Sequence, residues 1–334
     1  MKLKRVFGVI AVVCLSALVA LSQTPGYRIS APYSHENLTI YLVHGKNETE
    51  KTNILTLQEA MQKGILRVFE TSDVNELSVE NTSKQFDVFI QSGDIVKGGK
   101  QDRMLAVSII IAARSGRVKI ESFCVESGRW EKRGQEDAGQ FSSSNDRIVS
   151  KELKLAANGA RSQTEVWQKV SEAQQKLSRN VGGDVASANS ESSLQLSLEN
   201  GKVAATSDEY VKALSNLVEG KSDVIGYAFA VNGELNSADI YVSNSLFKKL
   251  WPRMLKAAAV EAVSERNVRA SVAAPAKPAA IQEFLADADS ARGEERAASG
   301  SARIVTRDQK DKAVYEARDE KSKTVVHRAY VKKQ

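Results

Sequence analysis

Cysteine, histidine, proline and glycine are all scarce in this sequence. Its 334 residues include 2 Cys, 3 His, 5 Pro and 20 Gly. So few glycines and prolines exclude a collagen-like or linker-dominated chain. The scattered histidines and cysteines have neither H-x-x-x-H nor C-x-x-C spacing, so the sequence offers no cluster of metal ligands. We therefore expect neither a metal site nor a cofactor.

A strong excess of one charge sign is also missing. The formal net charge is +6, but three of the 47 basic residues, Lys2, Lys4 and Arg5, lie in a predicted leader. Without them the chain has 44 basic and 41 acidic residues. This balance is not the electrostatic footprint of a nucleic-acid-binding protein, so we expect no nucleic-acid partner.

The first 22 residues have the pattern of a signal peptide. Three positive charges precede an apolar run, residues 6–21, and small residues at Ala20 and Ser22 favour cleavage before Gln23. The run is short for a membrane span, which needs about 20 apolar residues; an uncleaved anchor is the alternative. We expect an exported protein, periplasmic or secreted, with no stable membrane insertion after cleavage. Cleavage removes Cys14, so Cys124 remains alone and no internal disulfide can form.

The rest of the chain mixes strand and helix patterns without regular alternation. Capping boxes at Thr56–Glu59 and Thr206–Glu209 predict helix starts, and Asn232-Gly233 predicts a two-residue hairpin. A polar stretch, 133–146, predicts an exposed loop. The expected helices are 57–63, 164–179, 206–218 and 246–263, and the expected strands are 38–43, 65–70, 74–79, 86–91, 105–113, 118–125, 224–231, 234–242, 303–306, 313–318 and 324–331. The strand at 105–113 is expected to turn at Ser115-Gly116 into the next. The pattern predicts the α+β class, with a largely antiparallel sheet and several packed helices.

The densest polar segment runs from Ser92 to Arg103. Gly98 and Gly99 permit unusual backbone conformations, and four polar residues follow them: Lys100, Gln101, Asp102 and Arg103. The spacing does not match a Walker phosphate loop, because Gly99 stands at the lysine position. The simpler interpretation is a tight turn in which Asp102 and Arg103 lock the start of a buried strand by a salt bridge or by bonds to the backbone; the alternative is a ligand site.

A second segment, Phe123 to Trp130, combines a thiol with opposite charges. Cys124 and Glu126 share one face of a strand, and Arg129 and Trp130 follow a glycine turn. A catalytic cysteine needs a base, but His35, His44 and His327 are all distant in sequence. A buried, unreactive thiol is the simpler interpretation, with Glu126 and Arg129 forming a hydrogen-bonded corner. Near the C-terminus, Tyr315, His327 and Tyr330 are interpreted as a packed sheet face rather than a groove.

Seven segments in order along the chain carry a family resemblance. They read TLQEAMQKGILRVFE, VNELSVEN, SGDIVKGGKQDRML, FCVESGRW, DVIGYAFAVNGEL, LFKKLWPRMLKAAAVEAV and VVHRAYVKK, between Thr56 and Lys333. Together they resemble the ARG and rhodanese-phosphatase-superfamily-associated protein domain family, bacterial proteins of unknown function. The resemblance implies one domain over 23–334. The Ala- and Pro-rich composition of the insertion around 271–300 predicts that it is mobile or loosely helical. The resemblance implies no established catalytic activity or cofactor; roles proposed for the family, by genomic association, lie in conflict or defence systems.

Two functional hypotheses follow. The preferred one is a non-catalytic module that binds an unidentified ligand or protein of the cell envelope. Its ligand-binding candidates are Lys100, Gln101, Asp102, Arg103, Glu126 and Arg129. The alternative is a hydrolase or transferase that acts on an anionic substrate through Gln101-Asp102-Arg103 and Cys124-Glu126-Arg129, because paired guanidinium groups suit phosphate or carboxylate.

Overall fold

The computed structural model describes residues 26–71, 73–134, 136, 139–147, 150–267, 274–298 and 300–333. The predicted leader lies outside the described residues. Within them the chain forms seven α-helices and eighteen strands, and every strand pair except β4–β7 is antiparallel. The predicted α+β class with largely antiparallel pairing is confirmed, although three sheets take the place of the one expected.

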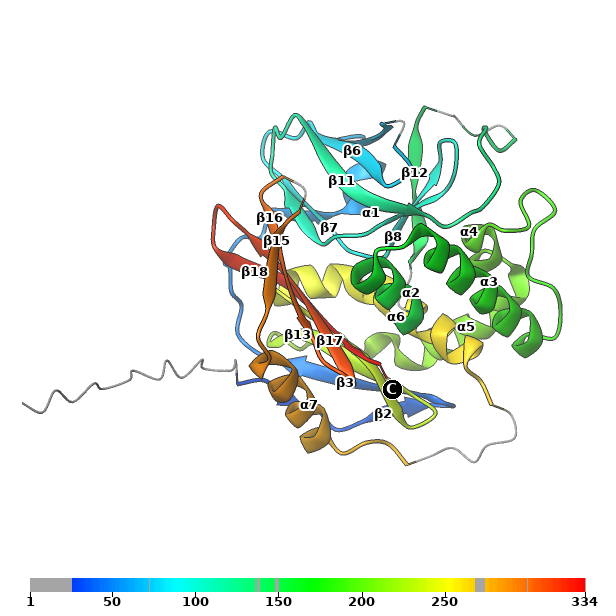
Figure 1. Cartoon of the computed structure of the whole chain (residues 1–334). Coiled ribbons are helices and arrows are strands. Elements are labelled where there is room, and N and C mark those ends of the chain that lie inside the picture. Colours follow the sequence, from blue (N-terminus) through cyan, green and yellow to red (C-terminus); the bar gives the residue numbers. More distant parts are fainter. Residues whose placement is uncertain are drawn as a thin grey trace, which may run out of the picture.

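The largest sheet has nine strands and forms one side of the molecule (Figure 1). Its order is β1-β3-β13-β14-β18-β17-β16-β15, with β2 paired to β3. Its strands are β1 (Arg28–Ile29), β2 (Tyr33–His35), β3 (Leu38–His44), β13 (Val224–Val231), β14 (Glu234–Tyr241), β15 (Glu294–Ala297), β16 (Ala302–Asp308), β17 (Lys312–Asp319) and β18 (Thr324–Lys332). The β13–β14 hairpin turns at Asn232 and Gly233, both with positive φ (54° and 84°), as predicted.

Helices cover both faces of this sheet. Side chains alternate between faces along a strand, so Ile40 and Leu42 of β3 join the core that contains α6 (Asn244–Ser264). Tyr41 and Val43 point to the other face, where they pack in the core that includes Ile281 and Leu285 of α7 (Pro278–Ser290). Because both faces are covered, β3 is buried along its whole length.

Two smaller sheets form a second lobe above the large one (Figure 1). Their orders are β10-β7-β4 and β12-β8-β9-β11-β6-β5. The strands are β4 (Ile54–Thr56), β5 (Leu66–Glu70), β6 (Glu76–Asn81), β7 (Asp87–Ile90), β8 (Asp94–Gly98), β9 (Arg103–Leu105), β10 (Ile109–Ile111), β11 (Arg117–Cys124) and β12 (Phe141–Arg147). Helix α1 (Leu57–Gln62) follows β4 with the predicted capping box at Thr56.

Helix α6 joins the two lobes. Its aromatic residues Phe247 and Trp251 pack on Tyr227 of the large sheet. On the other side, Arg253 pairs with the buried Asp94 carboxylate of β8 at 3.0 Å and donates to carbonyl groups of β12. The remaining helices pack beside it: α2 (Lys151–Lys154), a π-helix η1 (Leu155–Ala160), α3 (Gln163–Asn180), α4 (Leu194–Leu198), α5 (Gly201–Leu214) and a 3-10 turn η2 (Ser215–Val218).

Three local predictions are wrong. The expected strand at 105–113 is two strands in different sheets, β9 and β10, and β11 pairs with β6 and β9 rather than with β10. The expected loop at 133–146 contains the start of β12. The Thr206–Glu209 box is not a helix start: Asn200 caps α5, and Thr206 lies inside it with its hydroxyl on the Lys202 carbonyl. Strand pairing decided the first two segments, whereas the helix start moved because Asn200 provides a local cap six residues earlier.

The segment around 271–300 contains regular structure. Helix α7 buries Ile281, Leu285 and Ala288 against the large sheet, and β15 pairs with β16. Mobility of this segment remains a prediction. In the part of the chain that the structure describes, no helix has the length and apolar character needed to cross a bilayer.

Replacing Gly226 by Ala is expected to destabilise the protein strongly. A Cβ atom there would lie 2.3 Å from the Asp239 carbonyl oxygen and 2.9 Å from the Ile240 Cα atom, both in the paired backbone of β14. Overpacking of this kind costs about 1–3 kcal/mol. Gly201→Ala is the matched control, because nothing lies within 4 Å of its added methyl group at the start of α5. Thermal unfolding should separate the two; equal melting temperatures would contradict the pairing of Gly226 against β14.

Replacing Glu261 by Gln is expected to stabilise the protein above pH 7. Burial raises the pKa of Glu261 to about 7, and the charges of Glu152 and Glu265 add to the shift. An unfolded glutamate titrates near pH 4.3, so the carboxyl favours folding below that pH and this contribution is lost as the pH rises through 7. The amide stays neutral, so E261Q should gain on the order of 3 kcal/mol over wild type at pH 8 and nothing at pH 4. Urea unfolding at both pH values measures this; a gain independent of pH would contradict it.

Candidate functional site

The glycine turn between β8 and β9 folds around the carboxylate of Asp102. Gly98 and Gly99 have φ values of 103° and 58°, which favour glycine, and a Cβ on Gly99 would lie 2.4 Å from the Phe141 ring. The Gly98 amide donates to Asp102 Oδ1 at 3.0 Å. The turn therefore encloses one of the protein's own carboxylates.

Glu126, which follows β11, lies next to this turn and is fully buried. Its Oε2 accepts the backbone N–H of Asp102 at 3.1 Å. Arg129 donates through Nε and Nη2 to its two oxygens, both at 2.7 Å. Burial raises the pKa of Glu126, but hydrogen bonds from Arg129, Ser190 and the Asp102 amide outweigh that effect and leave the pKa lowered. This is the hydrogen-bonded corner expected from the sequence.

Arg133 supplies the counter-charge for Asp102. Its guanidinium donates to both Asp102 oxygens, at 2.8 and 3.2 Å, and to Glu136 at 2.9 Å. The Ser193 hydroxyl, the N-cap of α4, donates to Asp102 Oδ2 at 3.0 Å. Asp102, Glu126, Arg129 and Arg133 thus form one buried cluster, which we call the carboxylate–arginine cluster.

Arg103 belongs to a different contact set. Asp102 and Arg103 are consecutive where β9 begins, and consecutive strand residues point to opposite faces. The Arg103 side chain donates to Gln101 Oε1 at 3.1 Å and to the Cys124 sulfur, and lies 3.6 Å from Glu70. Asp102 therefore holds the turn through a backbone hydrogen bond, from the Gly98 amide, as one of the two expected ways. Its salt-bridge partner is Arg133 rather than Arg103.

Cys124 is enclosed on this second side of the sheet. Burial raises the pKa of its thiol to about 11, although the Arg103 charge lowers it. Gln163 of α3 holds both the N–H and the carbonyl of its backbone, each at 2.8 Å. A protonated, fully buried thiol is a poor nucleophile.

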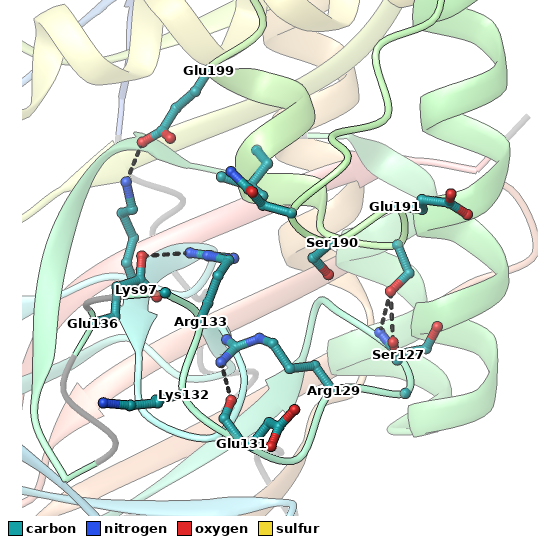
Figure 2. Close-up of a pocket in the computed structure, with 15 residues that line it drawn as sticks. Lys97, Ser127, Arg129, Glu131, Lys132, Arg133, Glu136, Ser190, Glu191 and Glu199 are labelled. Atoms are coloured by element: carbon teal, nitrogen blue, oxygen red, sulfur yellow. Dashed lines mark hydrogen bonds and ion pairs between the residues drawn. The ribbon is translucent and has the colours of Figure 1, made fainter.

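A cavity of about 1070 Å³ opens above the carboxylate–arginine cluster. Figure 2 shows Arg129 and Arg133 on one side of it and Ser190 and Glu191 on another. We call it the arginine-floored cavity. Most of the residues that line it have polar side chains: Lys97, Ser127, Gly128, Arg129, Glu131, Lys132, Arg133, Gly134, Glu136, Asn189, Ser190, Glu191, Ser192, Leu196 and Glu199.

Of the six residues predicted to bind a ligand, Arg129 alone lines this cavity. Gln101, Asp102, Arg103 and Glu126 are each at most 2% exposed. The Lys100 side chain is exposed on the turn, where the Lys100 amide donates to Glu70. The other five candidates therefore lie outside the cavity lining, whereas the second segment contributes Ser127, Gly128 and Arg129 to it. Within the described residues, no group of three or more His, Cys, Asp or Glu side chains is placed to hold a metal ion.

Comparison with known proteins identifies the family. A family model described as the ARG and rhodanese-phosphatase-superfamily-associated protein domain matches residues 26–331. The chain belongs to this family. No curated protein and no solved structure matches it.

In this member of the ARG and rhodanese-phosphatase-superfamily-associated family, the G-G-K-Q-D-R and C-V-E-S-G-R-W segments build the carboxylate–arginine cluster. Sequence reasoning missed Arg133, which lay in a segment predicted as an exposed loop, and Ser193, 91 residues away from the carboxylate that it contacts. The sequence held no signal for these partners, because Lys100 and Arg103 stand beside Asp102 and offered nearer cations.

Glu126→Gln tests the cluster through its pH dependence. Breaking a buried ion pair costs about 3–5 kcal/mol, so the variant should be less stable than wild type by about that amount at pH 7. Because the pKa of Glu126 is lowered by folding, its contribution is complete above the unfolded value near 4.3 and is lost as the pH falls through the folded value.

Urea unfolding at pH 7 and pH 3 checks this, with the difference between the proteins shrinking at pH 3. Glu131→Gln is the control, since this exposed residue lies beside the same cavity outside the cluster; its effect should stay within about 0.5 kcal/mol. An equal loss for E126Q at both pH values would contradict the role of the Glu126 charge.

Proposed function

We propose that this protein is an exported binding module of the cell envelope and that its arginine-floored cavity holds a neutral, hydroxyl-rich ligand, a saccharide. The observation that carries the proposal is the state of the two arginines. Both guanidinium groups already pair with buried carboxylates: Arg129 with Glu126 and Arg133 with Asp102.

The cavity lining has no excess of positive charge that would attract an anionic ligand. The lining carries four basic residues, Lys97, Arg129, Lys132 and Arg133, and four acidic ones, Glu131, Glu136, Glu191 and Glu199. The buried Asp102 and Glu126 add negative charge beneath the floor. A neutral ligand with many hydroxyl groups suits such a wall, because hydrogen bonds to charged groups are stronger than those between neutral groups.

An exposed aromatic residue is the sequence neighbour of two residues that line the cavity. Trp130 is 52% exposed and stands between Arg129 and Glu131, both of which line the cavity. An indole face in water is an apolar surface with a polar edge. It suits the C–H face of a sugar ring, while Ser127, Ser190 and Ser192 and the charged groups suit its hydroxyls.

The export proposal rests on the basic and apolar leader pattern of residues 1–22. Saccharides of the envelope are then the hydroxyl-rich ligands that the protein would meet. The alternative, a hydrolase or transferase for anionic substrates, has less support, because Gln101, Asp102, Arg103, Cys124 and Glu126 are buried and bonded to protein groups.

Calorimetric titration with neutral oligosaccharides of envelope type, and with anionic metabolites in parallel, tests the proposal. We expect a neutral oligosaccharide to bind and Trp130→Ala to weaken it at least about tenfold, the effect of losing roughly 1.4 kcal/mol of aromatic contact. Trp130→Phe keeps a flat apolar face and should retain most of the affinity. Binding of anions alone, or equal affinities for wild type and Trp130→Ala, would overturn the proposal.

A further inference from the structure

A second polar cluster lies at the junction of the two lobes and shares no residue with the arginine-floored cavity. It consists of Ser108, between β9 and β10, His327 of β18, Asp239 of β14 and Lys154 at the end of α2. All four are at most 8% exposed. We call it the serine–histidine cluster; it goes beyond the proposed binding function and does not depend on it.

Hydrogen bonds link Ser108, His327 and Asp239 in that order. Ser108 Oγ lies 2.9 Å from His327 Nδ1, and His327 Nε2 lies 3.0 Å from Asp239 Oδ1. A carboxylate accepts only, so Nε2 carries the ring proton and Nδ1 is left as the acceptor for the Ser108 hydroxyl. The order is hydroxyl, imidazole, carboxylate, the order of groups that activates a serine nucleophile, although here Nδ1 rather than Nε2 faces the serine.

A narrow slot lies at the serine end of this series of groups. It has a volume of about 20 Å³ and is lined by Ser108, His327, Asp239 and Lys154, together with Ser92, Asn158, Tyr315 and apolar side chains. This is room for one water molecule. The Lys154 ammonium lies 3.1 Å from Asp239 Oδ2 and lines the same slot.

An unusual helix forms one wall of the slot. Lys154 leads directly into the π-helix η1, which carries Asn158 and ends at Arg161 with a positive φ of 52°. Asn158 donates to Ser92 Oγ at 3.3 Å, and the Ser92 amide donates to Ser108 Oγ at 3.0 Å. π-Helices are rare and occur frequently at functional sites. A purely structural contact between the lobes requires neither this helix nor a slot that opens on the hydroxyl.

We propose that Ser108 is the nucleophile of an acyl-transfer site that accepts small esters, with His327 as its base. Ser108 Oγ forms a bond to the ester carbonyl carbon, and its proton moves to His327 Nδ1. The carbon–oxygen bond to the alcohol then breaks, and the alcohol leaves with that proton. Water, activated by the same nitrogen, hydrolyses the acyl-serine to a carboxylic acid and restores the hydroxyl. Asp239 holds the tautomer, and the Lys154 ammonium supplies positive charge beside the developing oxyanion.

The test uses methanesulfonyl fluoride, a small serine-directed reagent, on the folded wild-type protein. The Ser108 oxygen would displace fluoride and gain a methylsulfonyl group, which peptide mass spectrometry locates. We expect Ser108 to be labelled in the folded protein and not in urea, Ser108→Ala to lose the label, and His327→Gln to slow labelling about 100-fold, the scale of general-base catalysis. Hydrolysis of p-nitrophenyl acetate should fall in parallel.

Ser122→Ala is the matched control: Ser122 is a fully buried serine of the same lobe whose hydroxyl has no hydrogen-bond partner within the described structure. It should be labelled at Ser108 like wild type. Melting curves establish that the variants fold, and if His327→Gln does not, the comparison of folded and urea-unfolded wild type still decides. Absence of label on Ser108 in the folded wild type, or equal labelling in urea, would overturn the proposal and leave the cluster as a contact between lobes.

Discussion

The structure around the arginine-floored cavity depends on one constraint. A carboxylate removed from water must be paired with a cation, and its oxygens must accept hydrogen bonds from the protein. Asp102 and Glu126 are both fully buried. The glycine turn, the corner after β11 and the N-cap of α4 each supply donors to them. Loops that have no regular structure of their own are thereby held in place, and the cavity takes its shape from them.

The sequence separation of interacting residues explains which parts of the structure could be predicted from the sequence. The Asn232-Gly233 turn and the Thr56 capping box were predictable because their energetics involve residues within a few positions. The break of the 105–113 run was not, because Ser108 bonds the Ser92 amide and His327 from a different sheet. Glu126 with Arg129 was predictable at a separation of three residues, whereas Arg133 with Asp102 spans 31. Three-dimensional folding alone brings such partners together.

Buried polar groups also set the relation between the lobes. Arg253 of α6 reaches Asp94 of β8, and His327 of β18 reaches Ser108 in the upper lobe. Both bonds, each of which involves a buried group, would be lost if the lobes moved apart. These bonds hold the upper lobe in one position on the large sheet. The arginine-floored cavity, built from loops of the upper lobe and helix α4, and the serine–histidine cluster, placed at the junction, remain separate features of one body.

The arginines beneath the cavity serve the buried carboxylates rather than a ligand, and the other conclusions about the cavity rest on this. A double-mutant cycle on unfolding free energy, with Asp102→Asn, Arg133→Gln and the two combined, tests it most directly. We expect a coupling energy of about 2–3 kcal/mol, the upper part of the range for residues in one network, so that the double variant loses less stability than the sum of the two single losses by that amount. Additive effects, or single variants with wild-type stability, would contradict it.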